Sequence, residues 1–104
     1  MDLERSYRLC QRITKREAKN FYYAFITLPR EKRRAIYAVY AFCREADDIA
    51  DADKSIEEKK TQLEGLRSRL DQASTGDPQG GIDIALADAI ARYGIDPQDL
   101  EHVI

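Results

Sequence analysis

The chain has 104 residues, of which 43% are hydrophobic, and this is enough for one domain with a modest core. Seventeen basic against nineteen acidic residues leave a net charge of -2, which argues against a nucleic-acid binder that depends on overall positive charge. The apolar runs are far too short to span a bilayer and the N-terminus lacks the apolar region of a signal peptide, so we expect a cytoplasmic protein, with peripheral contact to a membrane as a further option.

Thiol and imidazole groups are few and widely spaced. Cys10 and Cys43 are far apart and neither has a Cys-x-x-Cys partner, so the sequence indicates neither a zinc site nor a disulfide framework. Free Cys usually behaves as a small core residue, and both thiols are therefore expected to be buried. His102, the single histidine, has no candidate partner nearby in the sequence, which leaves a catalytic triad without support.

Apolar residues recur at helical spacing throughout the chain, and no stretch alternates as a series of strands would, so an all-α domain is predicted. A first helix is expected from Asp2, as its N-cap, to about Asn20. The helical spacing continues from Phe21 to Leu28. Pro29 then interrupts the chain, and its fixed φ and missing N–H suit the first turn of the next helix.

A second and longer helix is predicted from about Pro29 to Asp53. Ser55 and Glu58 then have the spacing of a capping box, which predicts the start of a third helix. The buried stripe of this third helix is expected at four apolar positions, Ile56, Leu63, Leu66 and Leu70.

Residues 75–81 combine glycine, proline and polar turn formers, which predicts a surface loop. A fourth helix is expected over 82–93, with Gly94 as its C-terminal stop. Asp96-Pro97 then restarts a helix whose apolar stripe begins at three positions, Leu100, Val103 and Ile104. Because a helix that short is marginal on its own, we expect these residues to be the N-terminal piece of a larger helical fold.

Four charged residues stand in an otherwise apolar, helix-forming stretch: Arg44, Asp47, Asp48 and Asp51. Asp is a poor helix former, and carboxylates four residues apart repel by a few tenths of a kcal/mol unless a positive charge lies near them. At about 100° per residue, Asp47 and Asp51 project from one face, with Asp48 turned further aside. Magnesium suits such a pair, because it takes one or two carboxylates and completes its shell with waters and substrate phosphate oxygens.

Spacing alone leaves two alternatives open. Pairs of the form Asp-x-x-x-Asp also occur on solvated helix faces, although the neighbouring Ala, Tyr, Val and Phe residues favour a functional site here. Arg44 either pairs with Asp47 as a structural contact or binds a phosphate group through its planar guanidinium.

Three segments together carry a resemblance to a known family: Asn20-Phe-Tyr-Tyr-Ala-Phe25, then Leu28-Pro29, then Arg34-Ala-Ile-Tyr-Ala-Val-Tyr-Ala-Phe-Cys-Arg-Glu-Ala-Asp-Asp-Ile-Ala-Asp51. In this order they resemble the squalene/phytoene synthase family, and most of all the bacterial members that join two farnesyl diphosphates on the way to presqualene diphosphate, squalene and hopanoids. A weaker similarity extends through residues 85–93, so the resemblance covers nearly the whole chain.

The resemblance implies an all-α isoprenoid (terpenoid) synthase fold, in which two aspartate-rich helices face each other across a cavity and hold Mg²⁺ against the substrate diphosphates. The implied activity is that of a prenyltransferase, which condenses two farnesyl or geranylgeranyl diphosphates head-to-head through a cyclopropylcarbinyl diphosphate. NADPH would be used only by a complete squalene-forming enzyme. Residues 1–104 would be the N-terminal segment of such a domain without the second aspartate-rich motif, so the chain alone is expected to be an inactive fragment.

The resemblance also assigns roles to residues at matching positions. Asp47 and Asp51 match the catalytic, metal-associated carboxylates of the family, and Arg44 matches a basic residue that contacts diphosphate. Asp48 belongs to the same motif and is placed with the diphosphate-binding residues. Asn20 stands where many relatives have the second of two serines that contact diphosphate, and its amide can still donate a hydrogen bond.

A prenyl-chain pocket is expected to be lined by four aromatic residues, with ordinary core packing as the alternative for each: Phe21, Phe25, Tyr37 and Tyr40. Ala18 replaces the first serine of the family pair and cannot donate. This departure leaves the details of phosphate binding open.

A basic cluster at the start of the predicted second helix is interpreted first as a solvated face, and otherwise as an attractor of anionic substrates or of a membrane surface: Arg30, Lys32, Arg33 and Arg34. The expected partners are a prenyl diphosphate and either the missing C-terminal part of the fold or another chain, with no nucleic acid. The competing function is a non-catalytic helical interaction module, or a degenerate remnant, whose aspartates are surface charge. A third interpretation is a domain that becomes active when a separate chain supplies the second motif.

Overall fold

The computed structural model describes residues 1–102, and within that range the chain is helical with no strand, which confirms the all-α prediction. Val103 and Ile104, two members of the last predicted stripe, lie outside the described residues. The described helices, in chain order, are α1 (Leu3–Glu17), α2 (Lys19–Phe25), α3 (Arg30–Asp51), α4 (Ile56–Ser74), α5 (Asp83–Tyr93) and α6 (Pro97–Glu101).

Side-chain caps begin three of these helices where the sequence places them. The Asp2 carboxylate accepts from the N–H of Arg5 at 2.8 Å, and the Ser55 hydroxyl accepts from the N–H of Glu58 at 3.2 Å. Asp96 caps α6 in the same way, with Pro97 in the first helical turn. At the other end of α5, Gly94 adopts φ 62°, a left-handed conformation that suits glycine, and so ends the helix as predicted.

Three predicted boundaries are wrong by a few residues. The first helix was expected to reach Asn20, but it ends at Glu17, because Ala18 leaves the helical region with φ -146°. This break redirects α2 so that Tyr22 stacks on Tyr37, with ring centroids 5.4 Å apart. Pro29 is the N-cap of α3 and not part of its first turn, and α3 ends two residues before the predicted Asp53.

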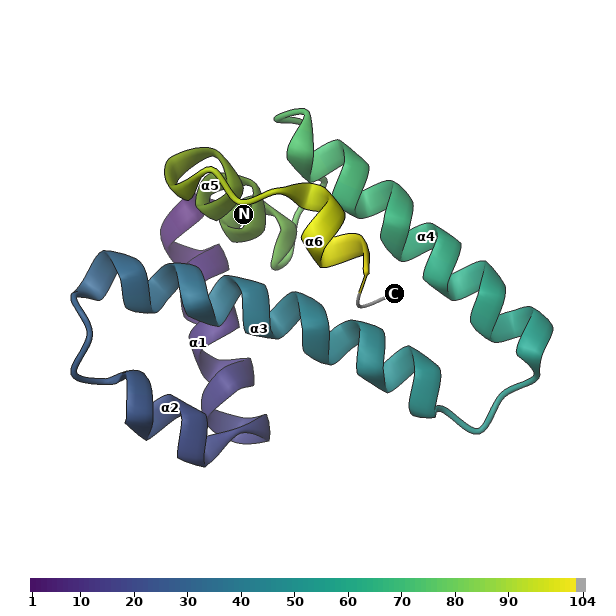
Figure 1. Cartoon of the computed structure of the whole chain (residues 1–104), viewed down its shortest axis with the longest axis horizontal. Coiled ribbons are helices and arrows are strands. Elements are labelled where there is room, and N and C mark those ends of the chain that lie inside the picture. Colours follow the sequence, from purple (N-terminus) through teal and green to yellow (C-terminus); the bar gives the residue numbers. More distant parts are fainter. Residues whose placement is uncertain (103–104) are drawn as a thin grey trace.

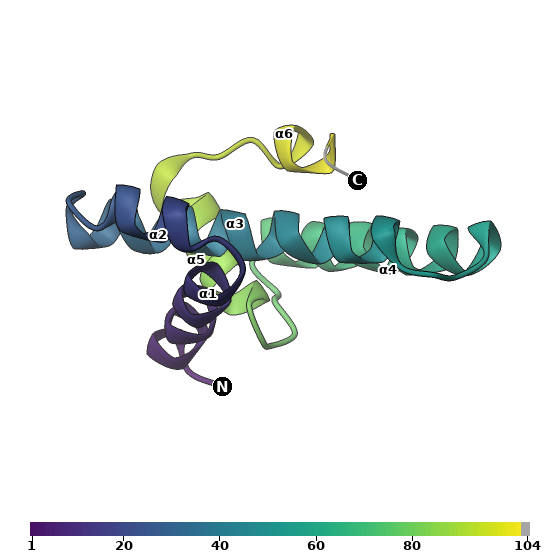
Figure 2. The ribbon, with the colours of Figure 1, turned by 90° about the horizontal axis from the view of Figure 1, so that it is seen from below.

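Helix α3 is the central element, and it packs against α1, α4 and α5 (Figures 1 and 2). Small residues make these contacts close, since Ala38, Ala85 and Ala89 are fully buried. The largest fully buried apolar side chains, Phe42, Leu66 and Leu86, come from α3, α4 and α5. The core therefore lies where these three helices and α1 meet.

The connection between α3 and α4 lies at the end of the molecule away from α1 and α5 (Figure 1). For this reason Ile56, predicted to be in the buried stripe of α4, is 72% exposed, whereas Leu66 and Leu70 further along the helix are buried as expected. None of the helices in residues 1–102 is long and apolar enough to cross a membrane.

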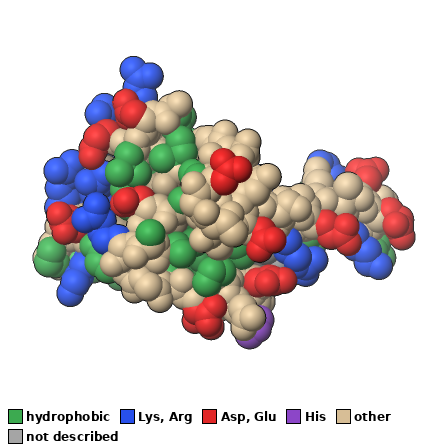
Figure 3. Space-filling view, turned by 90° about the horizontal axis from the view of Figure 1, so that it is seen from above, with side chains coloured by type: hydrophobic (Ala, Val, Ile, Leu, Met, Phe, Trp, Pro, Cys, Tyr) green, Lys and Arg blue, Asp and Glu red, His purple; other side chains and the backbone are tan. Residues whose placement is uncertain are grey.

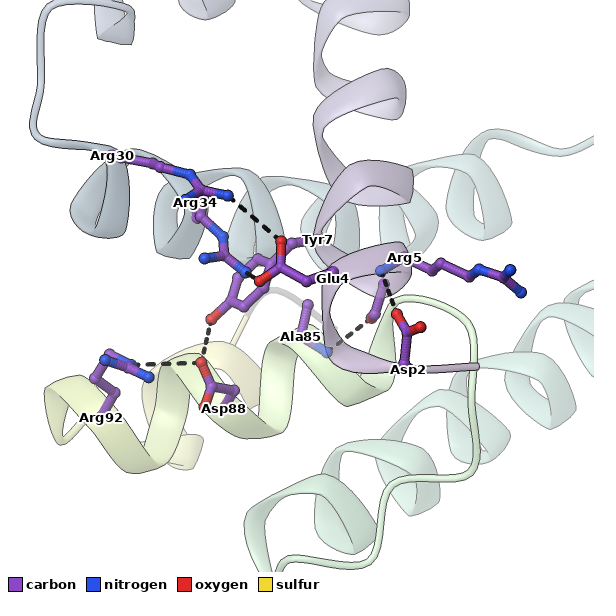
Figure 4. A network of polar contacts seen from close by, with 10 residues as sticks. Asp2, Glu4, Arg5, Tyr7, Arg30, Arg34, Ala85, Asp88 and Arg92 are labelled. Atoms are coloured by element: carbon purple, nitrogen blue, oxygen red, sulfur yellow. Dashed lines mark hydrogen bonds and ion pairs between the residues drawn. The ribbon is translucent and has the colours of Figure 1, made fainter.

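Two side chains of α1 form hydrogen bonds with residues that are distant in sequence. The buried Ser6 hydroxyl of α1 donates to the carbonyl of Gly81 at 2.6 Å and accepts from the N–H of Ala85 at 2.8 Å, in the first turn of α5. Nearby, the Tyr7 hydroxyl donates to Asp88 at 2.6 Å (Figure 4). Helix α5 has no side-chain cap of its own, so α1 supplies the hydroxyl that its N-terminus lacks.

A second network ties α3, α4 and α5 together. The Arg69 guanidinium donates from Nε and Nη2 to the two oxygens of Asp83, at 2.9 and 2.8 Å, and it also contacts Glu45. The buried Asp83 carboxylate is thereby paired, and its hydrogen bonds are the main cause that raises the pKa of Arg69. These contacts fix α3 against the two helices that follow it.

Candidate functional site

An open apolar cavity of about 590 Å³ lies along the first half of α3. Helix α2 forms one wall, α3 forms the floor, and Tyr93 at the end of α5 together with Ile95 forms the remaining side. Most of the lining is aliphatic or aromatic, with Lys32 as the charged member. The lining residues are Phe21, Phe25, Lys32, Ala35, Ile36, Val39, Tyr40, Cys43, Tyr93 and Ile95.

One face of α3 changes from apolar to anionic toward its C-terminus. Ile36, Val39 and Cys43 line the cavity at three- and four-residue spacing, and Asp47 follows one turn beyond Cys43. Burial raises the pKa of the Cys43 thiol, and the nearby Asp47 carboxylate raises it further. Cys43, the last residue of the apolar stripe, therefore lies close enough to the Asp47 carboxylate to feel its charge.

Asp47 and Asp51 are both exposed, and no ion pair or hydrogen bond within residues 1–102 occupies either carboxylate. They stand in the last two turns of α3, where the helix dipole is negative and no basic residue lies in the last turn. Lys59 of α4 donates from Nζ to the carbonyl of Ala50 at 2.8 Å and offsets part of this charge. The C-terminal end of α3 therefore favours the binding of a cation.

Arg44 is held by Asp48 and not by Asp47, which resolves one of the alternatives left open by the spacing. Its Nε and Nη2 donate to the same Asp48 oxygen, at 2.9 and 2.7 Å. The hydrogen bond and charge of Asp48 raise the pKa of Arg44. The Arg44 side chain keeps 33% of its exposure, so an anion can reach it.

Three of the four predicted pocket aromatics line the cavity: Phe21, Phe25 and Tyr40. The Phe21 and Phe25 rings stack with centroids 6.2 Å apart, and Phe21 is 59% exposed. Tyr37 is not among the lining residues. It is 2% exposed and stacks on Tyr22 in the core, because it projects from another face of α3. Core packing, the alternative given for Tyr37, is what the structure shows.

Asn20 lies in the first turn of α2 and is exposed. No hydrogen bond within residues 1–102 joins it to Arg44 or to the carboxylates at the end of α3. The structure therefore brings Arg44 and Asp48 into contact and sets Asp47 and Asp51 on neighbouring turns, but it leaves Asn20 outside this cluster.

Sequence reasoning missed part of the cavity. Ile36, Val39 and Cys43 were not predicted to line a pocket, although their spacing ahead of Asp47 is the signal that could have placed them beside the site. Tyr93 and Ile95 join the lining through the packing of α5 on α3. Their positions in the sequence gave no such signal.

The donor set fits a magnesium ion better than a metal held by protein alone. Among residues 1–102, no three His, Cys, Asp or Glu side chains are grouped so as to hold a metal ion. A pair of exposed carboxylates suits Mg²⁺, which commonly takes one or two carboxylates and fills its other positions with water and phosphate oxygens. Asp47 and Asp51 are the residues that would hold it.

Comparison with known proteins relates this chain to a family. A family profile described as squalene/phytoene synthase matches residues 14–104. The chain is 43% identical over 94 residues to a phytoene synthase of Mycobacterium tuberculosis, covering 90% of this chain and 30% of that protein. It is 35% identical over 102 residues to a 15-cis-phytoene synthase of Synechococcus elongatus, covering 98% of this chain and 33% of that protein.

The same similarity appears among solved structures. The crystal structure of squalene synthase HpnC from Alicyclobacillus acidocaldarius matches with a TM-score of 0.85 and 28% sequence identity. The match covers 94% of this chain and 36% of that chain. The chain thus spans about a third of the length of the relatives that it matches.

Proposed function

Because this chain belongs to the squalene/phytoene synthase family, we propose that it forms part of a prenyltransferase that condenses two prenyl diphosphates head-to-head. The single observation that carries the proposal is the course of α3. Its face lines an apolar cavity through Cys43 and then presents Asp47 and Asp51. A prenyl diphosphate requires such a site, because its apolar tail needs an apolar cavity and its diphosphate needs a metal-binding site beside that cavity.

The cavity supports binding of the prenyl chain. Its volume of about 590 Å³ falls in the range of about 300–1,000 Å³ typical of small-molecule sites. Each CH₂ group that moves from water onto the apolar lining contributes about 0.8 kcal/mol. Phe21, Phe25 and Tyr40 would contact the chain and keep water from an allylic cation.

The end of α3 supports binding of the diphosphate. Asp47 and Asp51 would hold Mg²⁺, which when bound stabilises the negative charge of the departing diphosphate. On substrate binding, the Arg44 guanidinium would release the Asp48 oxygen and donate to a phosphate oxygen instead. Asp48 in turn keeps the Arg44 guanidinium positioned before the substrate arrives.

The proposed chemistry follows from these two halves. One farnesyl or geranylgeranyl diphosphate loses its diphosphate, and a double bond of the second molecule attacks the allylic cation. The new cation then loses a proton as the three-membered ring closes, which gives a cyclopropylcarbinyl diphosphate and one free diphosphate. A complete squalene-forming enzyme would then rearrange and reduce this product with NADPH, as in a route to hopanoids. The 104 residues contribute the first aspartate motif and one wall of the tail site.

A binding experiment with a non-ionisable substrate analogue tests the proposal. Farnesyl thiolodiphosphate is titrated into the chain by calorimetry with and without Mg²⁺. We expect Mg²⁺ to raise the affinity by about tenfold or more, and Asp47→Asn together with Asp51→Asn to remove that gain. Asp71→Asn changes an exposed carboxylate on α4 and serves as the matched control.

The tail site has its own variant. Val39→Trp fills the cavity, so it should weaken the binding of farnesyl thiolodiphosphate much more than the binding of inorganic diphosphate. Unchanged Mg²⁺ dependence in the double carboxylate variant would remove the metal role from the proposal. Equal effects of Val39→Trp on both ligands would remove the tail site.

A second candidate function is a non-catalytic surface that binds another protein segment. It is favoured by the exposed aromatic and aliphatic side chains at the rim of the cavity and beside it, where Phe21, Tyr23 and Ile26 are 59%, 57% and 45% exposed. An interaction surface needs no magnesium. An affinity for the analogue that changes neither with Mg²⁺ nor on substitution of Asp47 and Asp51 would therefore favour this second function.

A further inference from the structure

A second pocket lies on another face of α3, and half of its lining residues are arginines. Its volume is about 210 Å³, and it forms where α1 meets the first turns of α3. Four arginines line it against a single carboxylate, Glu4. The arginines are Arg8, Arg30, Arg33 and Arg34. On the face shown in Figure 3, Lys and Arg side chains gather at the end of the molecule where α3 begins.

These arginines are unequally occupied. Arg30 and Arg34 reach the same Glu4 carboxylate, at 3.4 and 2.8 Å, and Arg34 also stacks over the Tyr7 ring (Figure 4). Arg33 donates one bond to the carbonyl of Ile26 at 2.8 Å. Within residues 1–102 no ion pair or hydrogen bond occupies the Arg8 side chain. The pocket therefore holds several N–H donors without acceptors.

A residue of the pocket wall carries a buried hydroxyl without a partner. Tyr37 forms part of the pocket wall and is 2% exposed, and its Oη is the buried side-chain oxygen without a hydrogen-bond partner in the described part of the chain. The Arg33 guanidinium lies close enough for its charge to act on this phenol. A buried hydroxyl left unpaired costs free energy, so this one calls for an acceptor.

We propose that this pocket binds a phosphate monoester group, with Arg8 and Arg33 neutralising its charge and the Tyr37 hydroxyl donating to one of its oxygens. Phosphate offers the planar guanidinium groups paired acceptors, and it supplies the acceptor that the phenol lacks. Tyr37 precedes Asp47 by ten residues, about 15 Å along the helix axis, so the site is separate from the carboxylate locus. The group comes either from a soluble phosphate monoester or from the headgroup of phosphatidic acid.

The test measures binding to the 104-residue chain in EDTA, which leaves the carboxylate locus without metal. Glycerol 3-phosphate and vesicles containing phosphatidic acid are titrated in parallel, with vesicles of equal charge made from phosphatidylglycerol as the diester comparison. Glycerol 3-phosphate saturating at one site assigns the soluble source. Saturation by phosphatidic acid alone, over phosphatidylglycerol, assigns the lipid source. Either result supports the proposal if the binding depends on Arg8, Arg33 and Tyr37.

Substitutions at three pocket residues, with one control variant, separate a built site from general attraction. Arg8→Gln with Arg33→Gln should abolish saturable binding, and Tyr37→Phe should weaken it about tenfold, the loss of one hydrogen bond to a charged group. Arg5→Gln also removes one positive charge from α1, but the Arg5 side chain points away from Arg30 and Arg34 (Figure 4). This control variant should therefore bind phosphate as the parent does.

The free chain provides an independent readout. Tyr37→Phe keeps the stacked ring and removes the unpaired hydroxyl, so its melting temperature without ligand should equal or exceed that of the parent. The rise in melting temperature caused by phosphate should shrink in the same variant. Unchanged phosphate affinity in Tyr37→Phe, or equal losses in Arg5→Gln and Arg8→Gln, would overturn the proposal and leave only non-specific attraction.

Discussion

The Arg69 guanidinium grips both oxygens of the buried Asp83 carboxylate, at 2.9 and 2.8 Å, and thereby ties α4 to the start of α5. Asp83 keeps only 4% of its side-chain exposure, so its charge depends on this partner. Removing one member of such a pair leaves the other uncompensated in a medium of low polarity.

Arg69→Leu should therefore lower the free energy of unfolding by about 2–3 kcal/mol, less than for a fully buried pair because Arg69 is itself 37% exposed. Urea denaturation followed by circular dichroism measures the change. Arg67→Leu on the same helix is the control, since its contact to Glu101 is 3.9 Å long and exposed, and it should cost at most about 1 kcal/mol. Equal losses in both variants would contradict the expectation.

Ser6→Ala should destabilise the chain by about 1–2 kcal/mol, because it leaves the N–H of Ala85 in the first turn of α5 without its acceptor. Urea denaturation gives the free energy of unfolding, and hydrogen exchange at Ala85 shows where the loss falls. Ser68→Ala, at an exposed position of α4, is the matched control. An unchanged exchange rate at Ala85 would show that α1 does not cap α5.

Asp48→Asn should increase the affinity for inorganic diphosphate in the absence of Mg²⁺, by about threefold to tenfold, because it frees Arg44 from its charged partner. Calorimetry measures the binding. The double variant Asp48→Asn, Arg44→Gln should lose the gain. Weaker binding in Asp48→Asn would instead show that Asp48 itself helps to bind the diphosphate.

The stability of the chain should fall as the pH rises from about 9, and one cause is Cys10. Burial raises the pKa of this thiol from 9.0 to about 12, so above pH 9 the unfolded chain releases a proton that the folded chain retains. The slope approaches about 1.4 kcal/mol per pH unit for each such group. Burial raises the pKa of Cys43 as well, so two thiols contribute.

Free energies of unfolding measured from about pH 8 to about pH 10 test this, below the range where tyrosines dominate. Cys10→Ala should be less stable at every pH but lose less stability across the range. A parallel dependence in the parent and in Cys10→Ala would show that the buried thiol does not titrate as stated.

Farnesyl diphosphate incubated with the 104 residues and Mg²⁺ should give no condensation product, because the described residues hold one carboxylate pair and no larger group of metal ligands. Product extraction followed by mass spectrometry is the measurement. Adding a separately expressed segment that carries a second aspartate-rich helix should restore product if the two assemble. Robust turnover by the 104 residues alone would contradict the half-site interpretation.

Local patterns predicted much of this molecule correctly. The caps at Asp2 and Ser55 and the stop at Gly94 depend on hydrogen bonds and dihedral angles within a few residues, so they can be read from the chain alone. The order of apolar and acidic residues on α3 is also local, because helical periodicity fixes which side chains share a face. The stripe of α3 that runs from Ile36 and Val39 through Cys43 to Asp47 follows from that periodicity.

Packing between distant segments decided the rest. Tyr37 and Tyr40 stand three residues apart in the same apolar run, yet Tyr37 stacks on Tyr22 in the core while Tyr40 lines the cavity. The break at Ala18, the exposure of Ile56 and the pairing of Arg69 with Asp83 likewise depend on which helices come together.

The sequence by itself determined the helices, the family resemblance and the face of α3 that carries Asp47 and Asp51, because each of these depends on residue order within a turn or two. Only the tertiary structure decided which aromatic rings enclose the cavity, that Arg44 pairs with Asp48, and that four arginines line one pocket together with Tyr37. Those arrangements are set by contacts between residues far apart in the chain, and periodicity holds no information about them.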